Sequence, residues 1–245
     1  MKVLRTANPA VKAFERRTET YYNRPMTLMG AVHKSFLLLF ILVIAAGAAW
    51  YYSSTGSSSA GFIAIGGIGG LITALIASFI PKSAPITAPL YAVLEGMAVG
   101  GISYYYASQY GGIVMQAILL TISVFAVMLV IYRTGIIKVT NKFRVAVFSA
   151  TLGIMLLYLV SFVLQLFGIG VPFLHGSSSL SIIISFVIVG VAALNLVLDF
   201  DLIERASRTG QPKYMEWYAG FALLVTLVWL YLEILRLLSK LANRN

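Results

Sequence analysis

The stretch Ser35–Tyr52, SFLLLFILVIAAGAAWYY, decides the fold class of this chain. It contains no charged residue and ends in three aromatic side chains. An α-helix needs about 20 mostly apolar residues to cross the hydrocarbon core of a bilayer, and aromatic residues gather where lipid meets water. The stretch therefore predicts a membrane-spanning helix.

The composition of the whole chain agrees with this local pattern. Of its 245 residues, 60% are hydrophobic and 11% are charged, whereas a soluble domain has about 25% charged residues. A water-soluble fold of this size has too little interior to hide so much apolar surface. The chain contains no cysteine, which excludes disulfides, thiolate nucleophiles and cysteine-ligated metals. We expect an all-α integral membrane protein.

Six more apolar runs follow the first, so we expect seven transmembrane helices. Their predicted bounds are 35–52, 61–80, 85–107, 112–132, 145–167, 180–199 and 214–238. Residues 1–29 form a basic cytoplasmic segment, 30–241 the transmembrane domain and 242–245 a C-terminal tail. Gly96 and Gly100 have the spacing of small residues at which membrane helices approach closely, and we expect them to pack within the molecule.

The net charge of +10 is interpreted as a sign of membrane topology, not of nucleic-acid binding. Seven Lys or Arg residues precede the first span, and the second, fourth and sixth connectors carry one, four and three. The first, third and fifth connectors carry none. This alternation places the N-terminus in the cytoplasm. Seven spans then place the basic C-terminal residues outside; the alternative is that the last helix does not fully cross, and we favour crossing.

Enzymatic activity is not expected. The chain has no His-Glu-x-x-His, Gly-x-Ser-x-Gly or P-loop motif. Its acidic side chains are more informative, because a charge at the centre of a membrane helix costs roughly 2.5–3.5 kcal/mol and marks function. Glu95 lies near mid-membrane with no Lys or Arg in its own span. We expect it to be the carboxylate most perturbed by desolvation.

Asp199 and Glu216 flank the predicted turn near residues 207–210. If two antiparallel helices meet there, both carboxylates lie at similar depth, and one of a close pair is expected to keep its proton. Such oxygen ligands also suit Ca²⁺, so Asp199 and Glu216 form a candidate calcium site. Alternatively, they form a structural hydrogen-bonded pair or lie apart as unrelated charges at the interface. Asp201 points to another face and is predicted to be a cytoplasmic surface charge or a supporting partner.

Glu233 and Arg236 are three residues apart on one helical face. An intrahelical ion pair near the membrane edge is the predicted arrangement.

Three stretches of the chain resemble the Bax inhibitor superfamily, and its bacterial YccA-like branch in particular. They are 94–103 (LEGMAVGGIS), 197–204 (VLDFDLIE) and 216–238, which begins EWY and ends WLYLEILRLL. The resemblance covers roughly residues 26–241. It implies seven helices with the last one packed inside the other six, and a pH-sensitive calcium leak.

The resemblance also implies that, in relatives, an aspartate near the end of helix six pairs with an aspartate on helix seven. Asp199 matches the first position. Aligning the Ile-Leu-Arg-Leu-Leu run places Thr226 at the second position, whereas aligning Leu230-Tyr231-Leu232 places Glu233 there, and Glu95 or Glu216 are further substitutes.

Two classes of function follow. The first is a cation leak of the plasma (inner) membrane with no cofactor, in which Ca²⁺ is the transported ion and protonation of buried carboxylates is the gate. The second is a regulatory membrane protein that transports nothing. Its basic N-terminal segment would contact anionic lipid or a partner such as a membrane protease.

Overall fold

The computed structural model describes residues 24–171, 174 and 176–244, and the segments with regular structure in this part of the chain are helical. The elements in chain order are α2 (Leu28–Ser54), α3 (Ser59–Phe79), the short 3₁₀ helix η1 (Pro81–Ser83), α4 (Ala84–Gln109), α5 (Ile113–Arg133), α6 (Asn141–Leu166), α8 (Ser179–Arg208) and α9 (Met215–Ala242). Seven of these helices are long and apolar enough to cross a membrane, which confirms the predicted fold class. Residues 1–23 of the predicted basic segment lie outside the described residues.

Two of the helices extend well beyond the predicted apolar runs. Helix α2 begins at Leu28, because the Thr27 hydroxyl accepts a hydrogen bond from the Gly30 amide (2.9 Å) and so caps the first turn. Helix α8 continues nine residues past Asp199 to Arg208. Asp199 therefore lies inside a helix and not at its end. Hydropathy marks the lipid-covered part of a helix, whereas capping and ion pairs decide where the helix stops.

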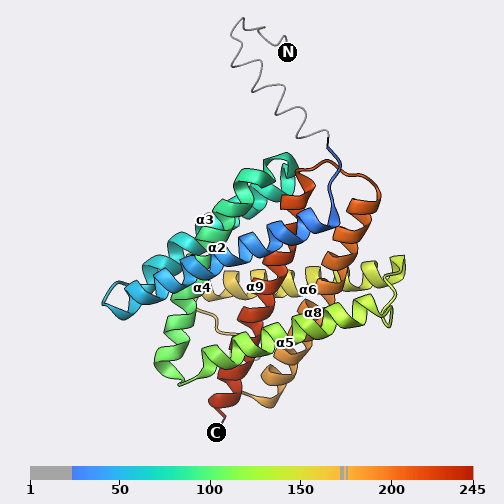
Figure 1. The fold of residues 1–245 in the computed structure, drawn as a ribbon. Helices are drawn as coiled ribbons and strands as arrows, with labels where there is room; N and C mark the ends of the chain where they lie inside the picture. The colour runs from blue at the N-terminus through green and yellow to red at the C-terminus, as the bar shows by residue number, and fades with distance from the viewer. Residues whose placement is uncertain (1–23, 172–173, 175, 245) are drawn as a thin grey trace, which may run out of the picture.

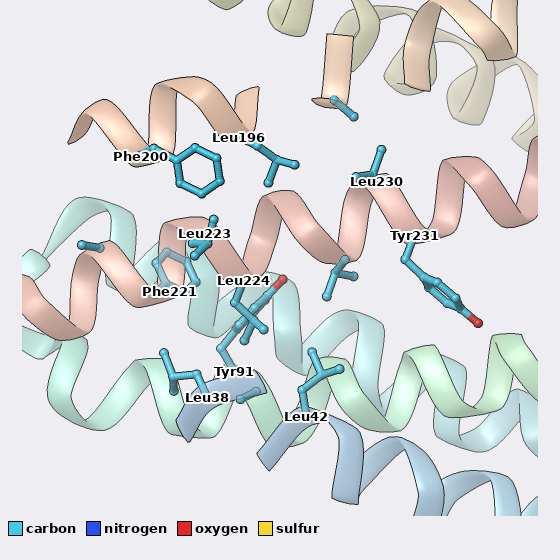
Figure 2. Close-up of a cluster of buried hydrophobic side chains, with 14 of the residues drawn as sticks. Leu38, Leu42, Tyr91, Leu196, Phe200, Phe221, Leu223, Leu224, Leu230 and Tyr231 are labelled. Atoms are coloured by element: carbon cyan, nitrogen blue, oxygen red, sulfur yellow. The ribbon is translucent and has the colours of Figure 1, made fainter. Parts of the chain in front are cut away.

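Helix α9 lies at the centre of the bundle. It packs against α2, α4, α5 and α8, and Figure 1 shows it running between the other helices. In its most apolar stretch, 56% of the residues are buried, compared with 11% for α6. Figure 2 shows Leu223, Leu224 and Leu230 of α9 facing side chains of α2, α4 and α8. The arrangement implied by the family resemblance, with the last helix inside the other six, is confirmed.

Helices α2, α3 and α4 form a tight group that depends on glycine. A Cβ atom added to Gly96 or Gly100 of α4 would collide with the backbone carbonyl oxygen of Leu42 or Ala46 in α2. Gly66 of α3 approaches the backbone of α4 in the same way. Small residues at such positions allow two helix backbones to approach closely. The glycine pair of α4 thus packs within the molecule, as predicted.

The two ends of the bundle differ in their basic residues, since Arg208 and Lys213 flank the 209–214 connector at one of them. At one end, which we name the basic end, the start of α2 contacts the 209–214 connector: the Met26 amide donates to the Gln211 carbonyl (2.7 Å), and Pro25 and Pro212 form an antiparallel bridge. At the opposite, far end, Tyr110 donates to Asn243 (2.8 Å). Helix α9 starts at the basic end and finishes at the far end, so it crosses the whole bundle.

Candidate functional site

A polar track follows one face of the central helix. Thr226, Glu233 and Lys240 are each seven residues apart on α9, and at 3.6 residues per turn this spacing places them on one face. Their partners come mainly from α8 and α6. Asp199 and Ser185, which contact Thr226 and Lys240, are fourteen residues apart on α8, as Thr226 and Lys240 are on α9. An antiparallel pair of helices in register produces this equal spacing.

Asp199 lies at the Thr226 end of the polar track, where its side chain interacts with the Thr226 hydroxyl. The Thr226 hydroxyl also donates to the Ala222 carbonyl (3.3 Å). The second carboxyl oxygen of Asp199, Oδ2, is buried and has no hydrogen-bond partner among the described residues. Of the two alignments that the family resemblance leaves open, the structure matches the one that places Thr226, not Glu233, opposite Asp199.

The predicted pair of Asp199 and Glu216 is not formed. Glu216 belongs to α9, is 1% exposed, and lies against the start of α2. Its Oε1 accepts hydrogen bonds from the Thr27 amide (3.0 Å), the Thr27 hydroxyl (3.1 Å) and the Lys213 ammonium (3.3 Å). A carboxylate at the N-terminus of a helix is electrostatically favoured. Gly30 leaves room for it, because an added Cβ would meet this carboxylate.

Contrary to the expectation from the sequence, Asp199 and Glu216 do not lie at similar depth, because residues 209–214 form the turn and add no helical rise. Glu216 is the second residue of α9, whereas Asp199 is nine residues from the end of α8. At about 1.5 Å per residue, Glu216 lies about 15 Å along α9 from Thr226. The candidate calcium site at these two carboxylates is therefore not assembled, and the described residues contain no group of three or more His, Cys, Asp or Glu side chains that could hold a metal ion.

For Asp201 the sequence leaves a cytoplasmic surface charge or a supporting partner as alternatives, and an exposed fraction of only 8% does not fit the surface charge. It accepts a hydrogen bond from Arg144 at the start of α6 (3.1 Å) and forms an ion pair with Arg205 one turn later in α8 (2.8 Å). Its neighbour Glu204 accepts from the Tyr132 hydroxyl of α5 and from Arg208. These acids fasten α5 and α6 to α8 at the basic end. They are structural ties beside the polar track.

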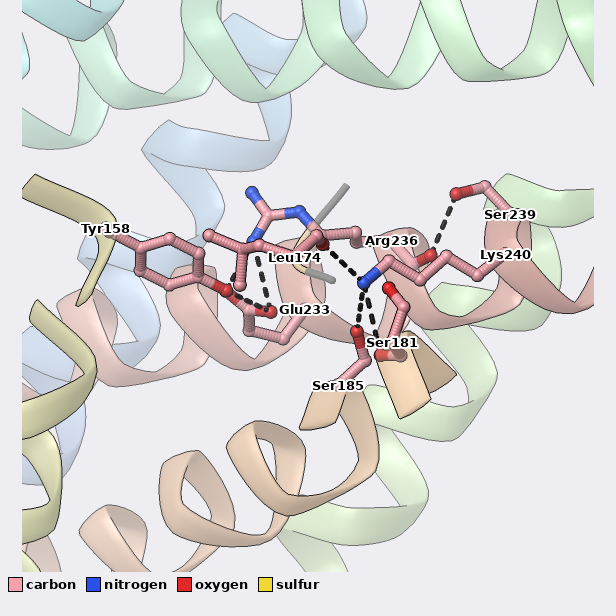
Figure 3. A network of polar contacts seen from close by, with 8 residues as sticks. All are labelled: Tyr158, Leu174, Ser181, Ser185, Glu233, Arg236, Ser239 and Lys240. Atoms are coloured by element: carbon pink, nitrogen blue, oxygen red, sulfur yellow. Dashed lines mark hydrogen bonds and ion pairs between the residues drawn. The ribbon is translucent and has the colours of Figure 1, made fainter. Parts of the chain in front are cut away.

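Glu233 and Arg236 form the predicted ion pair (3.0 Å), but the pair is part of a larger group. The Tyr158 hydroxyl of α6 donates to both Glu233 oxygens (2.8 and 3.0 Å) and accepts from Arg236 (2.5 Å), as Figure 3 shows. Glu233 is 2% exposed. Its charge is thus neutralised and hydrogen-bonded, which a buried carboxylate requires.

Lys240 is a site residue that the sequence reasoning missed. Its side chain is 4% exposed, and its ammonium donates to the Leu174 carbonyl (2.7 Å), the Ser181 carbonyl (3.3 Å) and the Ser185 hydroxyl (2.6 Å) (Figure 3). All three acceptors are neutral. The spacing of seven from Glu233, and of fourteen from Thr226, was the available signal. It was missed because a lysine near a chain terminus ordinarily reaches water.

Glu95 lies away from α9, in the contact between α4 and α3. Its carboxylate packs against Gly70, whose added Cβ would come within 2.5 Å of Oε2. Tyr91, one turn earlier in α4, is the nearby titratable side chain. No hydrogen bond is formed by this carboxylate within the described part of the chain. The structure therefore separates Glu95 from the other sequence-predicted acids.

Comparison with known proteins gives one match. The model of a family described as Bax inhibitor 1 like matches residues 8–243, which is almost the entire chain. No curated protein matches, and no solved structure matches.

Proposed function

Because this chain belongs to the Bax inhibitor 1 like family of membrane proteins, we propose that it is a pH-sensitive cation leak, with Ca²⁺ as the ion and Asp199 as the proton-binding gate. The supporting observation is the position of three acids along the central helix: Glu216 near its start and Glu233 near its end, which are both buried, and between them Asp199 against Thr226, whose Oδ2 atom is buried. Buried carboxylates inside a membrane bundle mark ion and proton paths.

The three acids together cover most of the depth of a membrane. Glu216 and Glu233 are seventeen residues apart, which is about 25 Å along a helix, and the hydrocarbon core of a bilayer is about 30 Å thick. The two outer acids are held by basic neighbours, Lys213 and Arg236. This arrangement corresponds to a closed state in which both ends of the path are occupied by ion pairs.

Asp199 differs from the outer acids in its surroundings. Thr226 is the side chain of α9 that interacts with it, and Asn195, one turn earlier in α8, is bonded to Thr151 of α6 (2.8 Å). Asp199 forms no ion pair with a Lys or Arg side chain of the described residues. An ionised Asp199 therefore lacks a counter-ion in the closed bundle. It must either keep a proton or take up a cation.

The surroundings of Asp199 can accommodate both its protonated and its ionised form. When it donates to the Ala222 carbonyl, its oxygen is free to accept the proton of a neutral Asp199. When Asp199 loses that proton, the unpartnered Oδ2 becomes an attractive ligand for a hard cation. Because proton and cation compete for one carboxyl, we expect flux to rise as the pH rises.

The test is Ca²⁺ flux into dye-loaded proteoliposomes across the neutral pH range. We expect pH-dependent flux in the parent protein, and we expect Asp199→Asn to remove the pH dependence. Thr226→Val, which removes the hydroxyl, should shift the pH profile, whereas the control Thr226→Ser should leave it in place. An unchanged profile in Asp199→Asn would reject Asp199 as the gate. Absence of flux at every pH from folded protein would reject the leak.

A second function, regulation of a membrane protein such as a protease, is favoured by a different observation. The chain enters α2 through contacts with the 209–214 connector and Glu216. A partner that binds the preceding basic residues would therefore act on the start of the central helix. Under this alternative, deletion of residues 1–23 abolishes binding of the partner and leaves any ion flux intact. In both cases we propose a multi-pass protein of the plasma (bacterial inner) membrane with its basic end in the cytoplasm.

A further inference from the structure

An apolar groove lies between α2 and α5, on a different side of α9 from the polar track. Helices α2 and α5 both pack on α9 but make little or no contact with each other, and Figure 1 shows them crossing α9 at different heights. The space between them is about 880 Å³ and opens to the outside of the bundle. This volume is within the range of about 300–1,000 Å³ that is typical of ligand pockets.

The wall of the α2–α5 groove is apolar even where it contains hydroxyl groups. Ser35 donates to the Ala31 carbonyl (2.9 Å), and Thr121 donates to the Ala117 carbonyl (2.7 Å). The hydroxyls of Ser103 and Tyr231 are bonded to each other (2.7 Å). These hydroxyl groups already have hydrogen-bond partners, so a molecule bound in the groove does not need to supply donors or acceptors for them. An apolar chain fits it best.

Charged groups line the groove at the basic end alone, where Arg133, Glu204 and Arg208 contribute to its wall. Glu204 is already paired with Arg208 (2.5 Å) and bonded to Tyr132. Arg133 is exposed and forms no ion pair within the described part of the chain. The mouth of the groove at this end therefore offers an unneutralised cation directly beside an apolar slot.

We propose that the α2–α5 groove binds one anionic phospholipid, with its phosphate at Arg133 and an acyl chain lying against α9. Basic residues at the surface of a membrane attract anionic lipids, and the groove ends where a head group of the leaflet next to the basic end would lie. The apolar wall and the single charged end match the two parts of such a molecule. This inference does not depend on the proposed ion flux.

The test is native mass spectrometry of the full chain, delipidated in detergent and titrated with dioleoyl phosphatidylglycerol or dioleoyl phosphatidylcholine. Arg133→Gln should weaken binding of phosphatidylglycerol roughly fivefold, the factor expected for one basic residue at a membrane surface, and leave phosphatidylcholine unaffected. Lys138→Gln is the matched control, because Lys138 is an exposed cation of the same connector that does not line the groove.

A second pair of variants tests the apolar part. Ile122 of α5 lines the groove and is 59% exposed, whereas Ile183 of α8 is 60% exposed and lies outside it. Ile122→Trp should fill the slot and weaken binding of both lipids, and Ile183→Trp should not. Equal binding by the two tryptophan variants, or phosphatidylglycerol binding unchanged in Arg133→Gln, would overturn the proposal. A dimer or a co-purified protein lost in Ile122→Trp would overturn it in favour of a second copy or a partner helix.

Discussion

At the scale of single residues, the described acids differ in how their charge is compensated. Asp201, Glu204, Glu216 and Glu233 each have a basic partner. Asp199 and Glu95 have none among the described residues. Since an uncompensated carboxylate is costly in a membrane interior, these two are the acids for which ionisation is least favoured by the surrounding side chains. Asp199 contacts the central helix, which is why the proposed gate is assigned to it.

The contact between Gly30 and Glu216 leads to a stability prediction. Gly30→Ala should push the Glu216 carboxylate away from Thr27 and Lys213, leaving a buried charge poorly bonded at a cost of about 1–3 kcal/mol. The expected result is a lower Tm in detergent, followed by tryptophan fluorescence. Gly47→Ala is the control, because an added Cβ there meets nothing within 4 Å.

A double-mutant cycle makes this prediction specific. If the cost of Gly30→Ala arises from Glu216, the substitution should cost much less in a Glu216→Ala background. An equal loss of Tm in both backgrounds would contradict the assignment.

At the scale of helices, the hairpin of α8 and α9 carries the polar track, and the α2–α3–α4 group carries the close packing. The two solve different problems. A polar stripe at a spacing of seven keeps hydrogen-bonding groups on one buried face, where every unsatisfied group is costly. Glycines four apart bring backbones together so that dispersion contacts hold the helices.

Gly100→Ala tests the close packing of α4 on α2. The added methyl group would meet the Ala46 carbonyl oxygen, and because that atom belongs to the backbone, it moves only if the helices separate. Overpacking of this kind costs about 1–3 kcal/mol, so we expect a lower Tm.

Gly153→Ala of α6 serves as the control, since its added Cβ has open space and alanine has the better helix propensity. A Tm for Gly100→Ala equal to that of this control would show that α2 and α4 separate at no cost.

At the scale of the whole molecule, the structure places the end of α9 at the far end of the bundle, opposite the α5–α6 connector. Because the natural chain has no cysteine, single cysteines report the side of the membrane directly. With a membrane-impermeant maleimide on intact cells, we expect Ser57→Cys and Arg244→Cys to be labelled and Lys138→Cys to be labelled only after lysis. Protection of Arg244→Cys in intact cells, together with Lys138→Cys, would mean that the seventh helix does not cross.

The fold class, the number of spans and the ion pair of Glu233 with Arg236 can all be predicted from the sequence alone. These follow from local properties: the length of apolar runs, the spacing on one helix and the alternation of basic connectors. The family resemblance added the inner position of the last helix. It also left Thr226 and Glu233 as alternatives for the partner of Asp199.

Which helices face one another, and in what register, depends on the packing of the whole bundle. The pairing of Asp199 with Thr226 depends on where α8 ends and α9 begins. Because the connector between them is six residues long, Glu216 lies beside the start of α2 and not beside Asp199. The burial of Lys240 and the groove between α2 and α5 depend on packing between distant segments. The local sequence shows which residues are apolar and which share a helical face. Contacts between helices, in contrast, depend on how the other six helices pack around α9.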